Sequence, residues 1–211
     1  MSDAANLRVA SLLASRLCHD LVGPLGAVDN GLELIAEGGG MAEEALALAQ
    51  RSAKRATTRL QYFRYAFGAA GGESNFGAGE ARAFALSLLQ NGEISIDWPA
   101  PTAETLPTGA GRLLLNMLLL GVDCLPRGGH IQVVARPDHL ATECAGPNAR
   151  VTPELKAAVL GTSSLAELTA RTVVGHYAAL LAASLGGKLE IPEQAPEKVR
   201  LQTALAPLRP S

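Results

Sequence analysis

A long run of apolar residues at heptad spacing constrains the fold of this chain more than any other feature. Nine positions follow steps that alternate between three and four residues: Leu7, Ala10, Ala14, Leu17, Leu21, Pro24, Val28, Gly31 and Ile35. This spacing places them on one face of a helix. We therefore predict a single helix over residues 3–37, whose apolar face must be buried against other helices.

A second helix is predicted after a short turn. Three glycines, at positions 38–40, should end the first helix, and residues 41–67 carry a second pattern near heptad spacing: Ala45, Ala49, Ser52, Ala56, Leu60, Phe63 and Phe67. A short connection between two such helices predicts an antiparallel hairpin. Because one hairpin has too little core to be stable alone, we predict a dimeric four-helix bundle. Four cations lie off the second pattern and are expected in solvent: Arg51, Lys54, Arg55 and Arg59.

The rest of the chain has mixed periodicity. Residues 68–79 are rich in Gly and Ala, which predicts a linker between a domain at 1–70 and a domain at 78–211. Helices are predicted over residues 81–90, 108–125, 153–160 and 165–185, and strands over residues 93–98, 130–136, 140–144, 188–191 and 199–205. This order favours an α+β fold, in which helices pack on one largely antiparallel sheet.

Composition argues against several classes of protein. The net charge of −2 leaves no basic surplus for a nucleic-acid partner. No apolar run reaches the roughly 18 residues of a membrane span, and the N-terminus lacks the pattern of a signal peptide. Three cysteines without paired spacing favour a reducing, cytoplasmic compartment, and no two Cys or His residues have the spacing of zinc ligands.

His19 is the residue best placed for chemistry in the first helix. In the heptad register it lies farthest from the apolar face, so its imidazole is expected in solvent. A neutral imidazole nitrogen is a good nucleophile near pH 7, and the adjacent Asp20 can accept a hydrogen bond from the ring. Six residues share this face and are expected to form an open surface on which a partner protein docks: Leu12, Ser15, Arg16, Val22, Gly23 and Gly26.

Pro24 is expected to bend the helix just beyond His19, because it has no N–H to donate to the carbonyl of Asp20. Cys18 diverges from His19 by about 100° around the helix and is expected to pack at the apolar face. A solvated histidine without a role is the other interpretation of His19. The remaining histidines are expected to be structural or solvated: His130, His139 and His176.

The segment Arg16–Glu33 resembles the phospho-acceptor box of two-component histidine kinases. The resemblance rests on His19-Asp20-Leu21, Pro24-Leu25 and Asn30-Gly31-Leu32-Glu33. It is closest to the ChpT-type histidine phosphotransferases and extends over the whole chain. It implies that the helical hairpin is a dimerisation and phosphotransfer unit, and that residues from about 78 onward form a degenerate kinase-ATPase-like α/β sandwich.

The second half departs from the ATPase pattern of these kinases at three places. Leu113–Asp123 is similar to the kinase N-box helix, but Gly121 stands where a kinase has the Asn that holds Mg²⁺. Residues 144–148 contain no Asp to read adenine, and residues 174–177 lack the glycine cluster of a phosphate-binding lid. The resemblance therefore implies that the fold is kept, that ATP binding is lost and that this chain binds no cofactor.

Together, the residues and the resemblance predict a histidine phosphotransferase of a multistep His–Asp phosphorelay. His19 would accept a phosphoryl group from the Asp of one receiver domain and pass it to the Asp of another, with Asp20 orienting the ring. The implied partners are the receiver of a hybrid kinase and the receivers of response regulators, each bringing its own Mg²⁺. A non-catalytic dimeric adaptor or decoy for receivers, and an ATP-dependent histidine kinase, are the alternatives.

Overall fold

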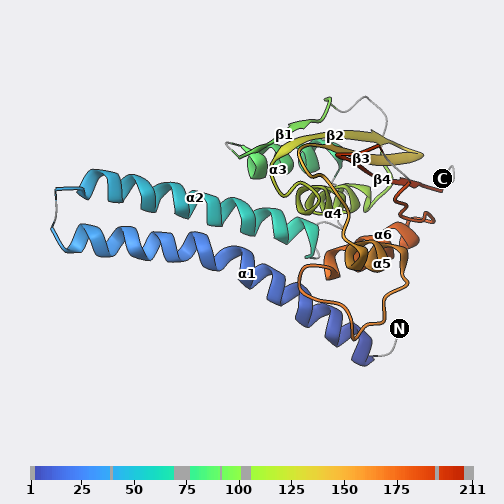
Figure 1. The fold of residues 1–211 in the computed structure, drawn as a ribbon, viewed down its shortest axis with the longest axis horizontal. Coiled ribbons are helices and arrows are strands. Elements are labelled where there is room, and N and C mark those ends of the chain that lie inside the picture. The colour runs from blue at the N-terminus through green and yellow to red at the C-terminus, as the bar shows by residue number, and fades with distance from the viewer. Residues whose placement is uncertain are drawn as a thin grey trace.

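The structure is a computed structural model that describes residues 3–38, 40–68, 77–90, 92–100, 106–192 and 195–206. Helices α1 (Asp3–Ala36) and α2 (Ala42–Ala66) form an antiparallel hairpin that projects from a globular part, which contains all the other elements (Figure 1). The two predicted helices are confirmed to within one residue at each end. The turn between them uses Gly38, whose φ of +72° is a conformation that glycine adopts readily.

Small residues let α1 and α2 approach each other closely. Ala45, Ala49, Ser52 and Ala56 of α2 are buried, as the second heptad pattern predicts. A Cβ atom added at Gly31 of α1 would lie 2.9 Å from the carbonyl oxygen of Ala45 and 3.0 Å from the Cβ of Ala49. The hairpin therefore has no room for a side chain at position 31.

The N-terminal part of α1 packs differently from the heptad prediction. With 34 residues against 25, α1 runs past the end of α2 and reaches the globular part (Figure 1). There Ala5 and Val9 are buried, whereas the predicted positions Leu7, Ala10 and Ala14 are exposed. Val9 joins the core cluster, which also contains the C-terminal residues of α2, and burial of the three predicted positions against a second hairpin stays a prediction.

The C-terminal end of α2 is anchored directly on α4 (Ala110–Asp123). The buried Tyr62 hydroxyl donates to the carbonyl of Leu115 at 2.6 Å. The amide of Asn116, also buried, donates to the carbonyl of Ala66 at 2.8 Å. The hairpin is thus joined to the second half by side-chain contacts. Residues 69–76 of the predicted linker lie outside the described residues, and the boundary between domains at 1–70 and 78–211 stays a prediction.

The second half is an α+β layer structure, as predicted. Its sheet has the order β1 (Ile94–Asp97), β2 (Gly129–Arg136), β3 (His139–Ala145) and β4 (Lys198–Ala204). Only the β1–β2 pair is parallel, since β2–β3 and β3–β4 are antiparallel. The helices α3 (Ala78–Leu89), α4, α5 (Pro153–Leu160) and α6 (Val173–Ser184) lie on one side of this sheet (Figure 1). The core centres on α4, in which every residue from Leu113 to Leu120 is buried.

The predicted helix over residues 165–185 begins later, at Val173, and turns replace its first part. Thr169 and Thr172 divert the backbone there, because the hydroxyl of each accepts a hydrogen bond from the N–H of the other, at 3.0 and 3.3 Å. In addition, Arg8 of α1 donates to three carbonyls of this segment, those of Leu165, Ala166 and Leu168. These hydrogen bonds occupy backbone N–H and carbonyl groups that would otherwise pair with one another in a helix.

The predicted strand over residues 188–191 is also wrong. It contributes one isolated bridge, between Glu190 and Gln202 of β4. Pro192 follows at once and has no N–H with which to continue the pairing.

Close packing of the hairpin predicts opposite effects for two glycines of α1. Gly31→Ala should lower the free energy of unfolding by about 1–3 kcal/mol, because its Cβ meets the backbone of α2. Gly26→Ala should raise it by about 1 kcal/mol, because an added Cβ there meets no atom within 4 Å and alanine favours helix. Urea unfolding of both variants tests this, and equal effects would contradict the described packing.

Candidate phosphotransfer site

The His19 side chain projects from the middle of α1 and is 80% exposed, as its heptad position predicts. Its Nδ1 lies 3.0 Å from Oδ1 of Asp20. An ionised carboxylate can only accept a hydrogen bond, so this contact favours the neutral tautomer that carries its proton on Nδ1. In that tautomer Nε2 keeps its lone pair and is the nucleophilic nitrogen of the ring.

The surface around His19 is open at most of the predicted docking positions. Val22 is 68% exposed. A Cβ added at Gly23 or Gly26 would meet no atom within 4 Å, so the backbone of α1 is accessible on this side. Ser15 is exposed, with its hydroxyl donating to the carbonyl of Ser11, and Leu12 is half-buried. Another protein can approach this face without displacing a large side chain.

Arg16 departs from the predicted open face, because its side chain is only 12% exposed. Its Nη1 and Nη2 donate to the two carboxylate oxygens of Asp123, at the end of α4, each at 3.0 Å. Its Nε donates to Oδ2 of Asp20 at 2.9 Å. Arg16 is therefore held between the two halves of the molecule and is not a free docking residue.

The charges of this cluster depend on one another. Burial disfavours the charged guanidinium of Arg16, but the hydrogen bonds and charges of Asp123 and Asp20 outweigh burial and raise the pKa of Arg16. Burial raises the pKa of Asp123 above its ordinary value, and the hydrogen bonds and charge of Arg16 act in the opposite direction. Arg16 thus opposes the effect of burial on the Asp123 carboxyl group.

The carbonyl of Asp20 has a partner that the sequence did not indicate. Pro24 lies inside α1 and cannot supply the usual backbone donor. Instead Nη1 of Arg59, from α2, donates to this oxygen at 2.7 Å. The expectation that Arg59 is solvated is therefore wrong, whereas Arg55 is exposed as expected. Figure 1 shows α1 bending along its length; the assignment of that bend to Pro24 remains a prediction.

The second half offers little space at the position of the kinase Mg²⁺ ligand. A Cβ added at Gly121 would lie 2.9 Å from Sγ of Cys144 and 3.2 Å from Cδ1 of Ile131. The sheet thus packs tightly against α4 at Gly121, the position that the resemblance aligns with the kinase Asn. Burial raises the pKa of both Cys124 and Cys144 to about 12, so these thiols are protonated near neutral pH and poor nucleophiles.

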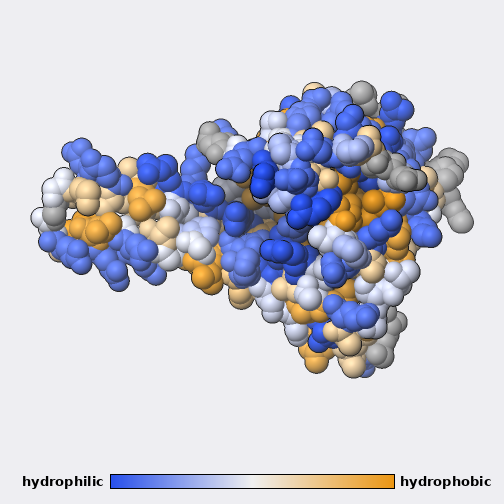
Figure 2. Space-filling view, in the orientation of Figure 1, coloured by the Kyte–Doolittle hydropathy of each residue, from blue (hydrophilic) through white to orange (hydrophobic). Residues whose placement is uncertain are grey.

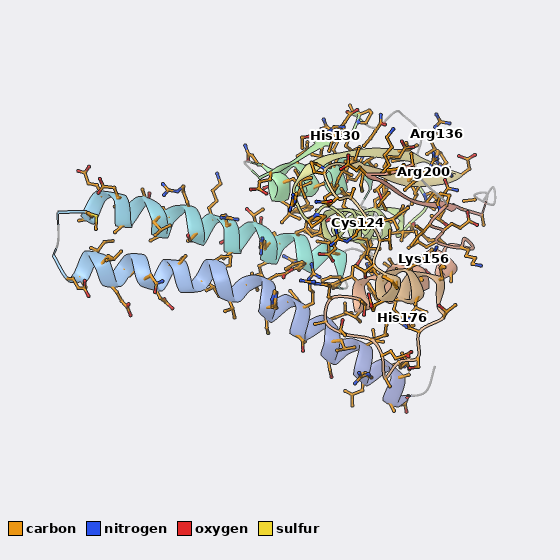
Figure 3. All side chains as sticks on the ribbon, in the orientation of Figure 1. Cys124, His130, Arg136, Lys156, His176 and Arg200 are labelled. Carbon is orange, nitrogen blue, oxygen red and sulfur yellow. The ribbon has the colours of Figure 1, made fainter. Side chains whose placement is uncertain are left out.

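The other candidates from the sequence do not converge on a site. Nδ1 of His130 lies 2.9 Å from Oγ of Ser95, and burial lowers the pKa of His176. Figure 3 shows these two histidines well apart in the globular part. Cys18 is exposed, not packed as predicted, because one residue step turns it about 100° away from Leu17. Within the described segments no three His, Cys, Asp or Glu residues are grouped as metal ligands would be.

Comparison with known proteins supports a phosphotransfer scaffold. Residues 78–197 match the model of a histidine phosphotransferase C-terminal domain. The protein phosphotransferase ChpT of Brucella abortus (strain 2308) is 38% identical over 191 residues, which cover 88% of this chain and 90% of the relative. A solved structure of a bacterial phosphotransferase superposes with a TM-score of 0.81 at 35% identity, over 96% of this chain and 97% of that one.

The class of protein is therefore a histidine phosphotransferase. This chain belongs to the histidine phosphotransferase family, which confirms the resemblance, the α+β fold and the phosphotransfer function predicted above. In the segments that the structure describes, no helix combines the length and apolar character needed to cross a membrane.

Two residues of this site were missed from the sequence, Asp123 and Arg59. Asp123 had a recognisable signal, because it is the only charged residue between Arg112 and Arg127 and follows a run that is apolar except for Asn116. Arg59 had none, because it stands among other cations of a helix surface.

The hydrogen bond from Arg59 can be tested against the proline that makes it necessary. Arg59→Met should lower the free energy of unfolding by about 1–2 kcal/mol, because the Asp20 carbonyl loses its donor. In a Pro24→Ala background the loss should shrink, because residue 24 then has an N–H within the helix. Arg55→Met, on the same helix, serves as the control and should change stability by less than about 0.5 kcal/mol. An equal loss from Arg59→Met in both backgrounds would contradict this account.

Proposed function

We propose that this chain is the intermediate of a multistep His–Asp phosphorelay, with His19 as the phospho-acceptor. The observation that carries the proposal is the exposed imidazole whose Nδ1 is engaged by Asp20, which leaves Nε2 as the free nucleophile. Membership of the histidine phosphotransferase family supports the same role. The donor is the aspartyl phosphate of a hybrid kinase's receiver, and the acceptors are the Asp residues of response regulators.

In each transfer one bond to phosphorus forms and one bond to phosphorus breaks. The lone pair of His19 Nε2 attacks phosphorus, the bond to the receiver's carboxylate oxygen breaks, and that carboxylate leaves with the electron pair. Positive charge develops on the imidazole, and the Asp20 carboxylate at Nδ1–H stabilises it. In the second transfer a carboxylate of the next receiver attacks phosphorus, and the electron pair returns to Nε2.

The surface around His19 supports docking of a receiver. Leu12, Ser15, Val22, Gly23 and Gly26 surround the histidine on the same side of α1, and the two glycines leave the helix backbone accessible. A receiver seated there would bring its phosphorylated Asp to the imidazole, and it would bring its own Mg²⁺. The work of this chain is then to position the ring and the partner.

We further propose that the second half binds no ATP and serves as a scaffold. The contacts around Gly121 support this, because Cys144 and Ile131 fill the space of the kinase's Mg²⁺ ligand. Asn116, which lies in the N-box-like helix, is used to hold the carbonyl of Ala66. Phosphoryl groups would therefore enter only from receivers.

A cytoplasmic homodimer formed through the hairpin completes the proposal. Apart from Leu160, the large apolar side chains that are exposed in the described residues all belong to α1, α2 or their turn: Leu7, Val22, Leu25, Leu32, Leu34, Met41, Leu46, Leu48 and Leu60. Figure 2 shows apolar residues exposed along the projecting hairpin. A second hairpin that covers these residues, apart from Val22 on the docking surface, would complete a four-helix bundle.

Transfer from a radiolabelled, phosphorylated receiver domain tests the relay. The wild-type chain should acquire acid-labile label, and His19→Ala should acquire none although its circular dichroism is unchanged. His130→Ala is the matched control, because it removes an exposed imidazole from the other half and should transfer like wild type. Light scattering on the same samples should give twice the mass of the 21.8 kDa chain.

Label on His19→Ala would exclude His19 as the acceptor. Absence of label from the wild type, with receiver binding intact, would favour the non-catalytic adaptor instead. A mass equal to that of one chain would contradict the homodimer.

A further inference from the structure

A continuous chain of charged contacts connects the second half of the molecule to the imidazole of His19. It begins at Asp123 of α4, whose two carboxylate oxygens accept from Arg16 at 3.0 Å each. It continues from Arg16 Nε to Asp20 Oδ2 at 2.9 Å, and from Asp20 Oδ1 to His19 Nδ1 at 3.0 Å. Asp123 and Arg16 are 107 positions apart in the sequence, so only the tertiary fold brings them together.

The middle of this chain is held rigidly. A guanidinium has donors on three nitrogens in one plane, and Arg16 uses all three to hold two carboxylates in fixed relative positions. Asp20 is in turn fixed at three oxygens, because Arg16 binds Oδ2, His19 lies at Oδ1 and Arg59 donates to the backbone carbonyl. The carboxylate that faces His19 therefore has little freedom to rotate away.

Three members of this chain are poorly exposed, since the side chain of Asp20 is also only 17% exposed. The side chains of Arg16 and Asp123 are 12% and 17% exposed, whereas that of His19 is 80% exposed. Water competes weakly for the inner contacts and strongly for the outer one. The contact between Asp20 and the exposed imidazole would open and close readily on its own, and the bridge behind Asp20 is what can keep the carboxylate in place.

We propose that Asp123 is a positioning residue for phosphotransfer. Acting through Arg16 and Asp20, it holds the Asp20 carboxylate in the orientation that keeps the proton of His19 on Nδ1 and leaves Nε2 as the nucleophile. This inference rests on the proposed role of His19. It gives the ATPase-like half a part in the chemistry that needs no nucleotide, because α4 supplies the residue on which the arrangement depends.

Asp123→Asn tests the proposal, with Asp138→Asn as the matched control on an exposed turn of the same half. The asparagine keeps the shape of the side chain but replaces one acceptor oxygen by a donor and removes the charge. Single-turnover transfer from a phosphorylated receiver should slow by about tenfold or more, while the Kd for the receiver stays within about twofold. The control should match the wild type in both measurements.

Two further readouts separate positioning from a merely structural role. If Asp123 acts through Asp20, Asp123→Asn should cause no further loss of rate in an Asp20→Asn background. By ¹⁵N NMR of the imidazole nitrogens, the wild type should show His19 mainly with its proton on Nδ1, and Asp123→Asn should show a mixture of tautomers. The NMR measurement needs no transfer, so it decides the inference even if the proposed relay fails.

Wild-type transfer rates and an unchanged tautomer in Asp123→Asn would overturn the proposal, and so would an undiminished loss of rate in the Asp20→Asn background. Should Asp123→Asn fail to fold, Arg16→Lys replaces it. A lysine keeps the charge but cannot hold both carboxylates at once, so the same slowing and the same mixture of tautomers are expected. A normal rate and tautomer in Arg16→Lys would equally reject the proposal.

Discussion

The guanidinium of Arg16, held between two carboxylates from opposite halves of the molecule, is the interaction on which the rest of this site depends. Removing one partner of such a poorly exposed pair leaves the other charge uncompensated, which costs about 3–5 kcal/mol in comparable cases. The bridge therefore fixes where α4 lies relative to α1. Arg8 adds a second attachment, to the carbonyls of residues 165–168. Between these points α1 is kept in a defined position on the globular part, with His19 just beyond the bridge.

The same packing fixes the second half of the molecule against the hairpin. The groups that hold α2 and α4 together are an N-box-like asparagine, Asn116, and a buried tyrosine, Tyr62, and both bond backbone carbonyls. At Gly121 the sheet comes so close to α4 that a side chain is excluded. The two side-chain hydrogen bonds strengthen the contact between α2 and α4. The half becomes a fixed support for the phosphotransfer helix.

The sequence predicted the parts of this structure that local periodicity determines. Heptad spacing located both hairpin helices and placed His19 on the exposed side of α1. The family resemblance added the prediction that this histidine is a phospho-acceptor. The sequence could not predict the contacts of Arg16 and Arg59, because their partners lie 107 and 39 positions away and are brought close only by the tertiary fold. Helix periodicity also predicted too early a start for α6. Before Val173 the backbone is held in turns by hydrogen bonds to side chains, including that of Arg8. The predicted exposure of this face thus holds at the two glycines and fails at Arg16, whose side chain is 12% exposed.

The central claim is that Asp20 holds the proton on Nδ1 of His19 so that Nε2 receives the phosphoryl group. It can be tested most directly by ¹⁵N and ³¹P NMR of the chain labelled in its histidines and phosphorylated by a receiver. The account predicts a phosphorus–nitrogen coupling to Nε2 of His19, with the proton retained on Nδ1. A phosphoryl group on Nδ1, or on any residue other than His19, would contradict it.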